Sequence, residues 1–96
     1  MHAVMRNYSG KGAREFYDLL ERRKSDVEQL MRGVQGFVSY SLVKTADGGF
    51  SVSVYQDKAG ADESSKQARE WTSKNAGNLG LSAPAVTEGT VVLQLK

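Results

Sequence analysis

Several residue types that commonly carry enzyme chemistry are scarce in this chain. It has no cysteine among its 96 residues, so it has no disulfide, no thiolate nucleophile and no cysteine-based metal site. Its single histidine is the second residue, His2, so neither a Ser-His-Asp triad nor a histidine metal site is predicted. The sequence also lacks the Gly-x-x-x-x-Gly-Lys and Gly-x-Gly-x-x-Gly phosphate-binding motifs. We therefore predict no metal site and no cofactor.

The chain also lacks long apolar segments and an excess of charge of one sign. No segment approaches the roughly 20 consecutive apolar residues that span a bilayer, and Arg6 interrupts the first apolar segment, so no signal peptide is predicted. The 13 basic and 11 acidic side chains leave a net charge of only +2 at pH 7, which does not indicate nucleic-acid binding. We expect a cytoplasmic protein without a membrane partner, folded as a single domain over residues 1–96.

The order of apolar segments predicts the fold. Alternation of apolar and polar residues indicates strands, and recurrence at three- and four-residue steps indicates helices. The predicted elements are a strand over His2–Tyr8, one long helix over Ala13–Val34, strands over Phe37–Lys44 and Phe50–Gln56, a second helix over Ala61–Ala76 and a strand over Thr90–Leu95. Ser25 and Glu28 have the spacing of a capping box, where the first helix could restart, but its apolar stripe continues across them. We therefore expect one helix.

The resulting order, β-α-β-β-α-β, is typical of ferredoxin-like folds of the α+β class. It predicts a four-stranded antiparallel sheet with two helices on one face, and Asp47-Gly48-Gly49 suits the hairpin turn between the middle strands. The second strand is apolar on both faces, for example at Val43 and at Tyr40. Because a two-layer domain leaves one sheet face uncovered, we expect a second copy of the chain to cover it. This predicts a homodimer through the sheet face, with Tyr40 in the interface.

The second predicted helix has an unusual inward face. Its residues are small or polar, and Trp71 is the only large apolar side chain on it. A helix of this kind either packs weakly or lies over a cavity. We therefore treat the space beneath Trp71 as a candidate binding site.

Two further features carry a resemblance to a known family. Gly36-Phe37 opens the second strand, and Trp71 lies in the second helix. With the element order, these features make nearly the whole chain resemble the dimeric α/β-barrel superfamily, which includes antibiotic-biosynthesis monooxygenase-like proteins. The resemblance implies that two ferredoxin-like subunits pack sheet against sheet, and that a pocket lies between each sheet and its helices.

The resemblance also implies site residues. Asn7 and Trp71 fall where haem-degrading members carry an Asn and a Trp, but no histidine follows Trp71 to ligate haem iron, so haem degradation is not predicted. The cofactor-independent quinone-forming monooxygenases of the superfamily need no haem. By resemblance to these, Asn7 and Trp71 are candidate catalytic residues, the first orienting a substrate oxygen and the second stacking on a ring. The candidate ligand-binding residues are Asn7, Tyr17, Tyr40, Tyr55 and Trp71. Arg6 is expected on the opposite face of its strand from Asn7, inside the dimeric barrel.

We expect the protein to bind a hydrophobic or aromatic small molecule between sheet and helices. Two interpretations stay open: a cofactor-independent monooxygenase, and a non-enzymatic binding or accessory protein for which the loop from Asn78 to Ala85 is a lid or partner contact. RNA-recognition domains share the element order and form a third class. They need stacking aromatics on the first and third strands, but Val52 occupies one such position, so RNA binding is not favoured.

Overall fold

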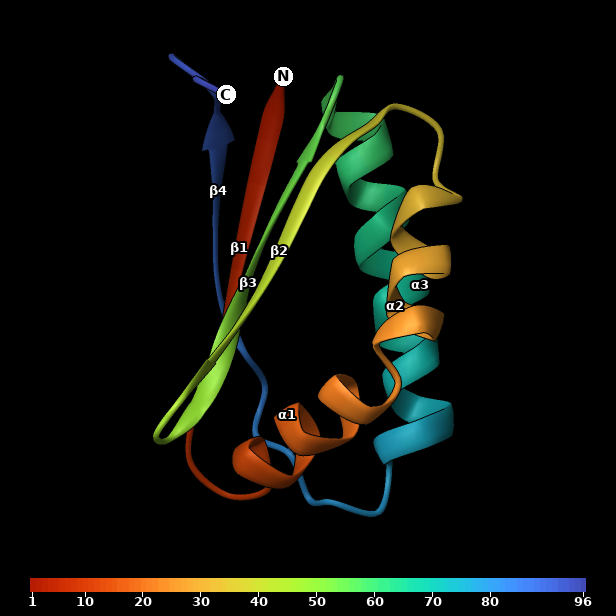
Figure 1. Ribbon diagram of the computed structural model, residues 1–96, viewed down its shortest axis with the longest axis vertical. Coiled ribbons are helices and arrows are strands. Elements are labelled where there is room, and N and C mark those ends of the chain that lie inside the picture. The colour runs from red at the N-terminus through yellow and green to blue at the C-terminus, as the bar shows by residue number, and fades with distance from the viewer.

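A four-stranded antiparallel sheet forms one layer of the molecule, and all the helices lie on one of its faces (Figure 1). The computed structural model describes residues 1–96. The elements in chain order are β1 (His2–Tyr8), α1 (Ala13–Arg22), α2 (Lys24–Arg32), β2 (Phe37–Thr45), β3 (Gly48–Tyr55), α3 (Lys58–Ala76) and β4 (Ala85–Thr90). The strands are arranged β2-β3-β1-β4. This arrangement confirms the predicted α+β class and ferredoxin-like sheet.

The prediction of one long helix from Ala13 to Val34 is wrong. The helix breaks at Arg23, whose backbone angles (φ −110°, ψ 27°) are not helical, and α2 restarts at Lys24. Ser25 does not cap α2, because no side-chain hydrogen bond caps its first turn. The apolar periodicity continues across the break because both helices bury the same side, with Leu20 of α1 and Val27 of α2 in one core cluster.

The predicted last strand, Thr90–Leu95, is also wrong. The strand β4 lies earlier, from Ala85, the last residue of the predicted loop, to Thr90, the first residue of the predicted strand. It pairs with β1 from Asn7↔Ala85 to His2↔Thr90. Because β1 begins at His2, which already pairs with Thr90, the residues after Thr90 have almost no partner strand, and only the Val91 N–H bonds to the Met1 carbonyl at 2.9 Å. The apolar side chains of the tail, Val92, Leu93 and Leu95, are exposed.

The remaining elements match their predicted positions closely. The hairpin between β2 and β3 pairs Thr45 with Gly48, so its loop has two residues, and Gly48 has a φ of +153°. The helix α3 begins three residues earlier than predicted, because Asp57 caps it by accepting a hydrogen bond from the Gly60 N–H at 3.0 Å. No helix in the structure combines the length and the apolar character that a bilayer crossing requires.

The two faces of the sheet differ in their environment. On the helix side, Val4 and Arg6 of β1 lie level with Ser53 and Ser51 of β3. These side chains are buried against the helices, and the main core cluster above them contains Phe16, Tyr17, Leu20, Val27, Met31 and Ala76. Tyr40 pairs with Ser53 and packs against that cluster. The prediction that Tyr40 lies in a sheet-to-sheet interface is therefore wrong.

The opposite face of the sheet, called here the outer face, carries no helix (Figure 1). Its side chains alternate with those of the helix side and include Ala3, Met5, Asn7, Val43, Phe50, Val52 and Val54. Most of these residues are apolar, and Met5 and Val43 are each 37% exposed. The outer face is thus a largely apolar surface that no helix covers, although Val54 on it is buried.

Candidate functional site

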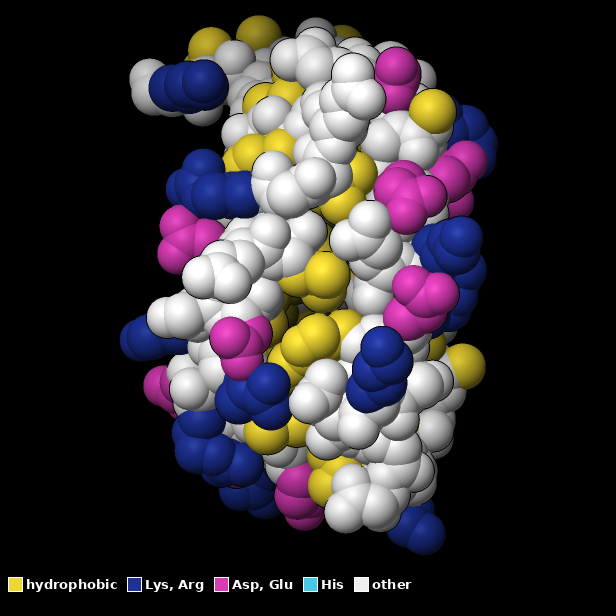
Figure 2. Space-filling view, turned by 90° about the vertical axis from the view of Figure 1, so that its right-hand side faces the viewer, with side chains coloured by type: hydrophobic (Ala, Val, Ile, Leu, Met, Phe, Trp, Pro, Cys, Tyr) yellow, Lys and Arg dark blue, Asp and Glu magenta, His cyan; other side chains and the backbone are white.

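A cavity of about 50 Å³ lies between the sheet and the helices, and we call it the inner cavity. It is lined by Arg6, Tyr8, Phe16, Leu20, Val27, Leu30, Met31, Tyr40, Ser51, Ala68, Trp71 and Thr72. Space remains because α3 contributes small side chains, Ala68 and Thr72, where a well-packed core helix would carry larger ones. Figure 2 shows apolar side chains at the bottom of a hollow on the helix-covered side, flanked by charged residues.

Arg6 is the only charged residue that lines the inner cavity. Its side chain projects from the centre of β1 and is 8% exposed. The guanidinium donates a hydrogen bond from Nη2 to the Ser65 hydroxyl of α3, and Ser65 in turn donates to the Ala61 carbonyl at 3.0 Å. None of the ion pairs in the structure includes Arg6. A buried positive charge without a carboxylate partner therefore faces the cavity.

Two tyrosines place their hydroxyl groups near this charge. Burial raises the pKa of Tyr8, and the positive charge of Arg6 offsets only part of that increase. Burial likewise raises the pKa of Tyr40, which the Ser51 hydroxyl and Arg6 lower in part. Both phenols therefore stay protonated at neutral pH and can donate hydrogen bonds to an oxygen atom of a ligand.

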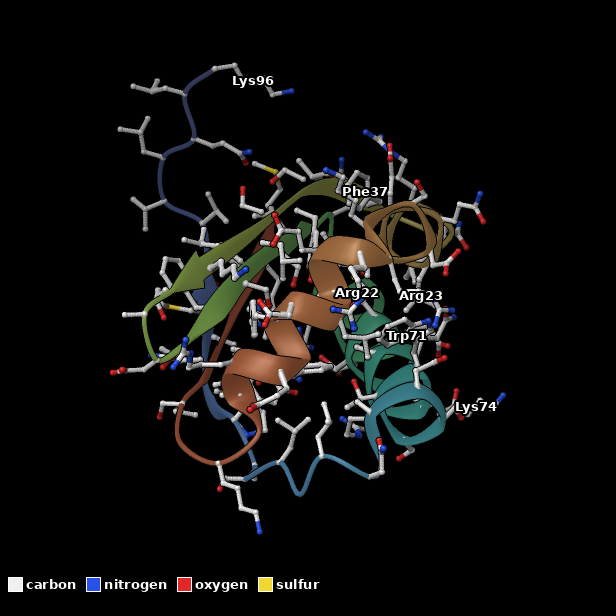
Figure 3. The ribbon with its side chains drawn as sticks, turned by 60° about the horizontal axis from the view of Figure 1, so that its bottom comes forward. Arg22, Arg23, Phe37, Trp71, Lys74 and Lys96 are labelled. Atoms are coloured by element: carbon white, nitrogen blue, oxygen red, sulfur yellow. The ribbon has the colours of Figure 1, made fainter.

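Trp71 forms the α3 side of the inner cavity and is held from the outside by Arg23. The Arg23 guanidinium carbon lies 5.4 Å from the centre of the Trp71 ring, and its Nη1 donates to Asn75 Oδ1 at 3.2 Å. Figure 3 shows Arg23, from the junction of α1 and α2, beside Trp71. The helix break thus has a structural consequence, because it places a cation on the exposed side of the tryptophan ring.

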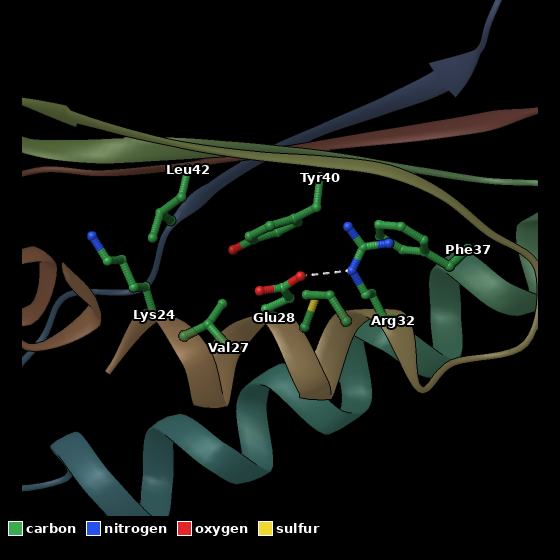
Figure 4. A pocket seen from close by; sticks show the side chains of 8 residues that line it. Lys24, Val27, Glu28, Arg32, Phe37, Tyr40 and Leu42 are labelled. Carbon is green, nitrogen blue, oxygen red and sulfur yellow. Dashed lines mark hydrogen bonds and ion pairs between the residues drawn. The ribbon is translucent and has the colours of Figure 1, made fainter. Parts of the chain in front are cut away.

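A second cavity, of about 240 Å³, lies between α2 and β2, and we call it the outer cavity (Figure 4). Tyr40 and Leu42 extend from the sheet toward α2, and Lys24 and Arg32 of α2 stand at its edges. Arg32 pairs with Glu28 at 2.9 Å, so its charge already has a partner. Three side chains, those of Val27, Met31 and Tyr40, line both cavities and separate them.

The structure brings together only part of the predicted site. Tyr40 and Trp71 both line the inner cavity. Tyr17 is buried beside it with its ring against the backbone of Gly49, and Tyr55 is fully buried and donates its hydroxyl to the Met31 carbonyl at 3.1 Å. These two tyrosines belong to the packed core.

Asn7 lies apart from the other predicted site residues. It pairs with Phe50 and Ala85 on the outer face, where its side chain is exposed. The expectation that Arg6 enters the interior of a dimeric barrel is wrong for the same reason, since Arg6 faces the helices. The predicted alternation of side chains along β1 is confirmed, but the face with Asn7, and not the face with Arg6, was expected to meet the helices. Val4 and Tyr8, which share a face with Arg6, are the signal that would have indicated the correct side.

The loop after α3 is anchored. Leu79 and Leu81 pack against the main core cluster, and the backbone of Leu79 lies so close to Gly12 that a side chain there would meet it at 2.6 Å. The structure contains no group of three or more His, Cys, Asp or Glu side chains placed to hold a metal ion. The inner cavity itself has neither a carboxylate nor an imidazole among its lining side chains.

Comparisons with known proteins place this geometry in a known fold. No family model and no curated protein sequence matches the chain. The haem-degrading protein MhuD from Mycobacterium tuberculosis aligns over 100% of this chain and 100% of its own, with a TM-score of 0.69 and 13% identity. A dimeric ferredoxin-like protein from an uncultured marine organism covers 99% of this chain and 95% of its own (TM-score 0.66, 13% identity).

SnoaB, a cofactor-independent oxygenase from Streptomyces nogalater, is also similar. The alignment covers 98% of this chain and 94% of SnoaB, with a TM-score of 0.63 and 18% identity. At such identities the likeness concerns the fold. The chain therefore shares the fold of these solved structures, one of which is a dimeric ferredoxin-like protein, and the predicted ferredoxin-like fold is confirmed.

Proposed function

We propose that this protein binds a hydrophobic or aromatic small molecule in the inner cavity. The observation that carries the proposal is the lining of that cavity, in which the Trp71 ring and the Tyr8 and Tyr40 hydroxyls converge around one buried cation. An aromatic ring offers a stacking surface, and protonated phenols fix the orientation of a polar group. The fold supports the proposal, because SnoaB, an oxygenase, has the same fold.

The activity to test first is cofactor-independent oxygenation of a phenolic ring. In such a reaction a phenol and O₂ give a quinone and water, with one oxygen atom entering the ring and the other leaving as water. The protein would hold the substrate oxygen by hydrogen bonds from Tyr8 and Tyr40 and the ring against Trp71. The reaction proposed here does not involve haem. The only histidine, His2, is bonded to Glu88 at 2.7 Å and does not line the cavity, so the cavity offers no imidazole ligand to haem iron.

Binding without turnover is the second candidate, and one observation favours it. The cavity has no carboxylate or imidazole to act as a general base. A substrate would have to lose its proton to solvent or ionise readily by itself. A protein that only binds the ligand needs no such group.

Oxygen uptake with 1,5-dihydroxynaphthalene separates the two candidates. An oxygenase converts it with O₂ to 5-hydroxy-1,4-naphthoquinone and water, which an oxygen electrode and the quinone absorbance both record. We expect Trp71→Phe and Tyr40→Phe to lower the rate, whereas Glu70→Gln, an exposed change on the same helix as Trp71, should leave it unchanged. Binding without oxygen uptake would leave the non-enzymatic role. Absence of both binding and uptake would refute the proposal.

We further propose that the outer face packs against the outer face of a second copy. The face is largely apolar, no helix lies on it, and Met5 and Val43 are each 37% exposed there. A protein of the same fold is described as dimeric, which supports a second copy as the partner. A carboxylate at the centre of such an interface would be buried without a partner in both subunits.

Val52→Glu is the test of this interface. Val52 pairs with Met5 near the middle of the outer face. Light scattering after size-exclusion chromatography should give a dimer for the native chain and a monomer for Val52→Glu, with Lys66→Glu on the helix side as the control that stays dimeric. A native monomer, or a Val52→Glu protein that remains a dimer, would contradict this interface.

A further inference from the structure

The unpaired charge of Arg6 suggests which chemical class of ligand the inner cavity selects. Removing a guanidinium from water is unfavourable unless an opposite charge or several hydrogen bonds replace its hydration. Arg6 is 8% exposed, yet the structure gives it a single protein acceptor, the Ser65 hydroxyl. A guanidinium has five N–H donors, so most of its hydrogen-bonding capacity is directed at the cavity and its solvent.

We propose that Arg6 is the anion-recognition residue of the inner cavity, and that the preferred ligand is an aromatic compound bearing an acidic oxygen, a carboxylate or a phenolate. This inference rests on the proposed function, since it assigns a ligand class to the same cavity. The acidic group binds Arg6 at the sheet, and the ring lies toward Trp71 and Tyr40. Both of these side chains line the cavity together with Arg6.

The arrangement of the other side chains supports this assignment. No acidic residue lines the inner cavity to compete for Arg6. The hydroxyl groups of Tyr8, Tyr40 and Ser51, which lie around the same space, can donate further hydrogen bonds to an anion. The inner cavity has a volume of only about 50 Å³, which suits a small head group such as a carboxylate. Met31, a flexible side chain that separates it from the outer cavity, can move to accommodate a larger ring.

Arg6 also differs from the other cations near the cavities. Arg32, at the outer cavity, is paired with Glu28, and Arg23 is paired with Asp26. Lys24 has no ion-pair partner, but it stands at the edge of the outer cavity and is exposed to solvent, where an ionic contact contributes little. If the cavity prefers anions, Arg6 is therefore the residue that should produce the preference.

The test compares two probes that differ in charge and hardly in size, 2-naphthoate and 2-naphthamide. Isothermal titration calorimetry at pH 7.5 should give the native protein an affinity at least tenfold higher for the naphthoate. Arg6→Met keeps a long side chain but removes the charge, so it should bind the two compounds about equally. Arg6→Lys should keep part of the preference, and Lys24→Gln should keep all of it.

The outcomes separate this inference from the proposed function. Equal affinity of the native protein for both probes would overturn the role of Arg6 while leaving an aromatic binding site. Loss of the preference in Lys24→Gln would also overturn it, because the edge of the outer cavity would then be the anion site. Binding of neither probe would overturn both proposals. Should Arg6→Met fail to fold by circular dichroism, Arg6→Lys takes its place, and a preference for the naphthoate in that variant as large as that of the native chain would count against recognition by the Arg6 guanidinium.

Discussion

Gly49→Ala is expected to destabilise the protein through the packing of Tyr17. A β-carbon at Gly49 would lie 2.4 Å from two ring carbons of Tyr17 and 2.5 Å from the Val43 carbonyl oxygen of the neighbouring strand. These distances are far below van der Waals contact, and the carbonyl belongs to the backbone of the sheet, so it cannot move aside as a side chain would. Overpacking of a core typically costs about 1–3 kcal/mol, and the double clash indicates the upper part of that range.

Urea denaturation followed by circular dichroism measures this change as a lower midpoint at an unchanged slope. Gly89→Ala is the matched control, because Gly89 is also a strand glycine without positive φ, and a β-carbon there meets nothing within 4 Å. Its stability should be unchanged or higher by up to about 1 kcal/mol. In a double-mutant cycle, Tyr17→Leu should relieve part of the Gly49→Ala loss. A Gly49→Ala protein as stable as the native chain would refute the placement of Tyr17 against β3.

Two further predictions concern the cap of α3 and the buried tyrosines. Asp57→Ala should lower the free energy of unfolding by about 0.5–2 kcal/mol, because the Gly60 N–H loses its acceptor, whereas Asp57→Asn should retain most of it; equal urea midpoints for the two variants would contradict the cap. Burial raises the pKa of the tyrosines above the ordinary value of 10.0; these are Tyr8, Tyr17, Tyr40 and Tyr55. Their contribution to stability is therefore complete below about pH 10 and is lost as the pH rises through the folded pKa. The free energy of unfolding, measured between pH 8 and 11, should fall above pH 10, and a flat profile there would contradict the prediction.

The local patterns in the sequence predict most of the fold, and the failures have physical causes. Alternation in β1 and β3 is a local feature, so it could be predicted, and so could a hairpin between β2 and β3. The turn itself was predicted over Asp47-Gly48-Gly49, whereas Gly48 and Gly49 already pair with β2 and the loop is formed by residues 46–47. The break at Arg23 could not be predicted, because Arg23 bonds to Asn75, which is 52 positions away in the chain. The local contact of Arg23 is an ion pair with Asp26 at 2.6 Å, which the apolar stripe of the sequence does not reveal.

The last strand shows a different limit. All six residues of β4 are exposed, since it is an edge strand held by backbone pairing to β1. Its sequence, Ala85–Thr90, therefore lacks the apolar alternation that identifies a half-buried strand. The more apolar tail after it imitates that pattern, although β1 is too short to pair with it.

The candidate site could be predicted only in part, at Trp71 of α3 and Tyr40 of β2. The small inward face of α3 correctly indicated a cavity beside Trp71. The sheet residues that complete it depend on which face of β1 meets the helices, and a period-2 pattern identifies two faces without orienting them. For this reason the sequence favours Asn7 as the site residue, whereas the structure places Arg6 at the inner cavity and Asn7 on the outer face. The free charge of Arg6 became apparent only when its surroundings were known.

Binding of an aromatic ligand in the inner cavity can be observed directly at Trp71. Trp71 is the only tryptophan, so its indole N–H gives a single isolated signal in a ¹⁵N-resolved nuclear magnetic resonance spectrum. On titration with 2-naphthoate, this signal and the backbone amides of Ala68 and Thr72 should shift together with one dissociation constant. Shifts confined to Met5 and Val52 on the outer face, or no shift of the Trp71 signal, would contradict binding in the inner cavity.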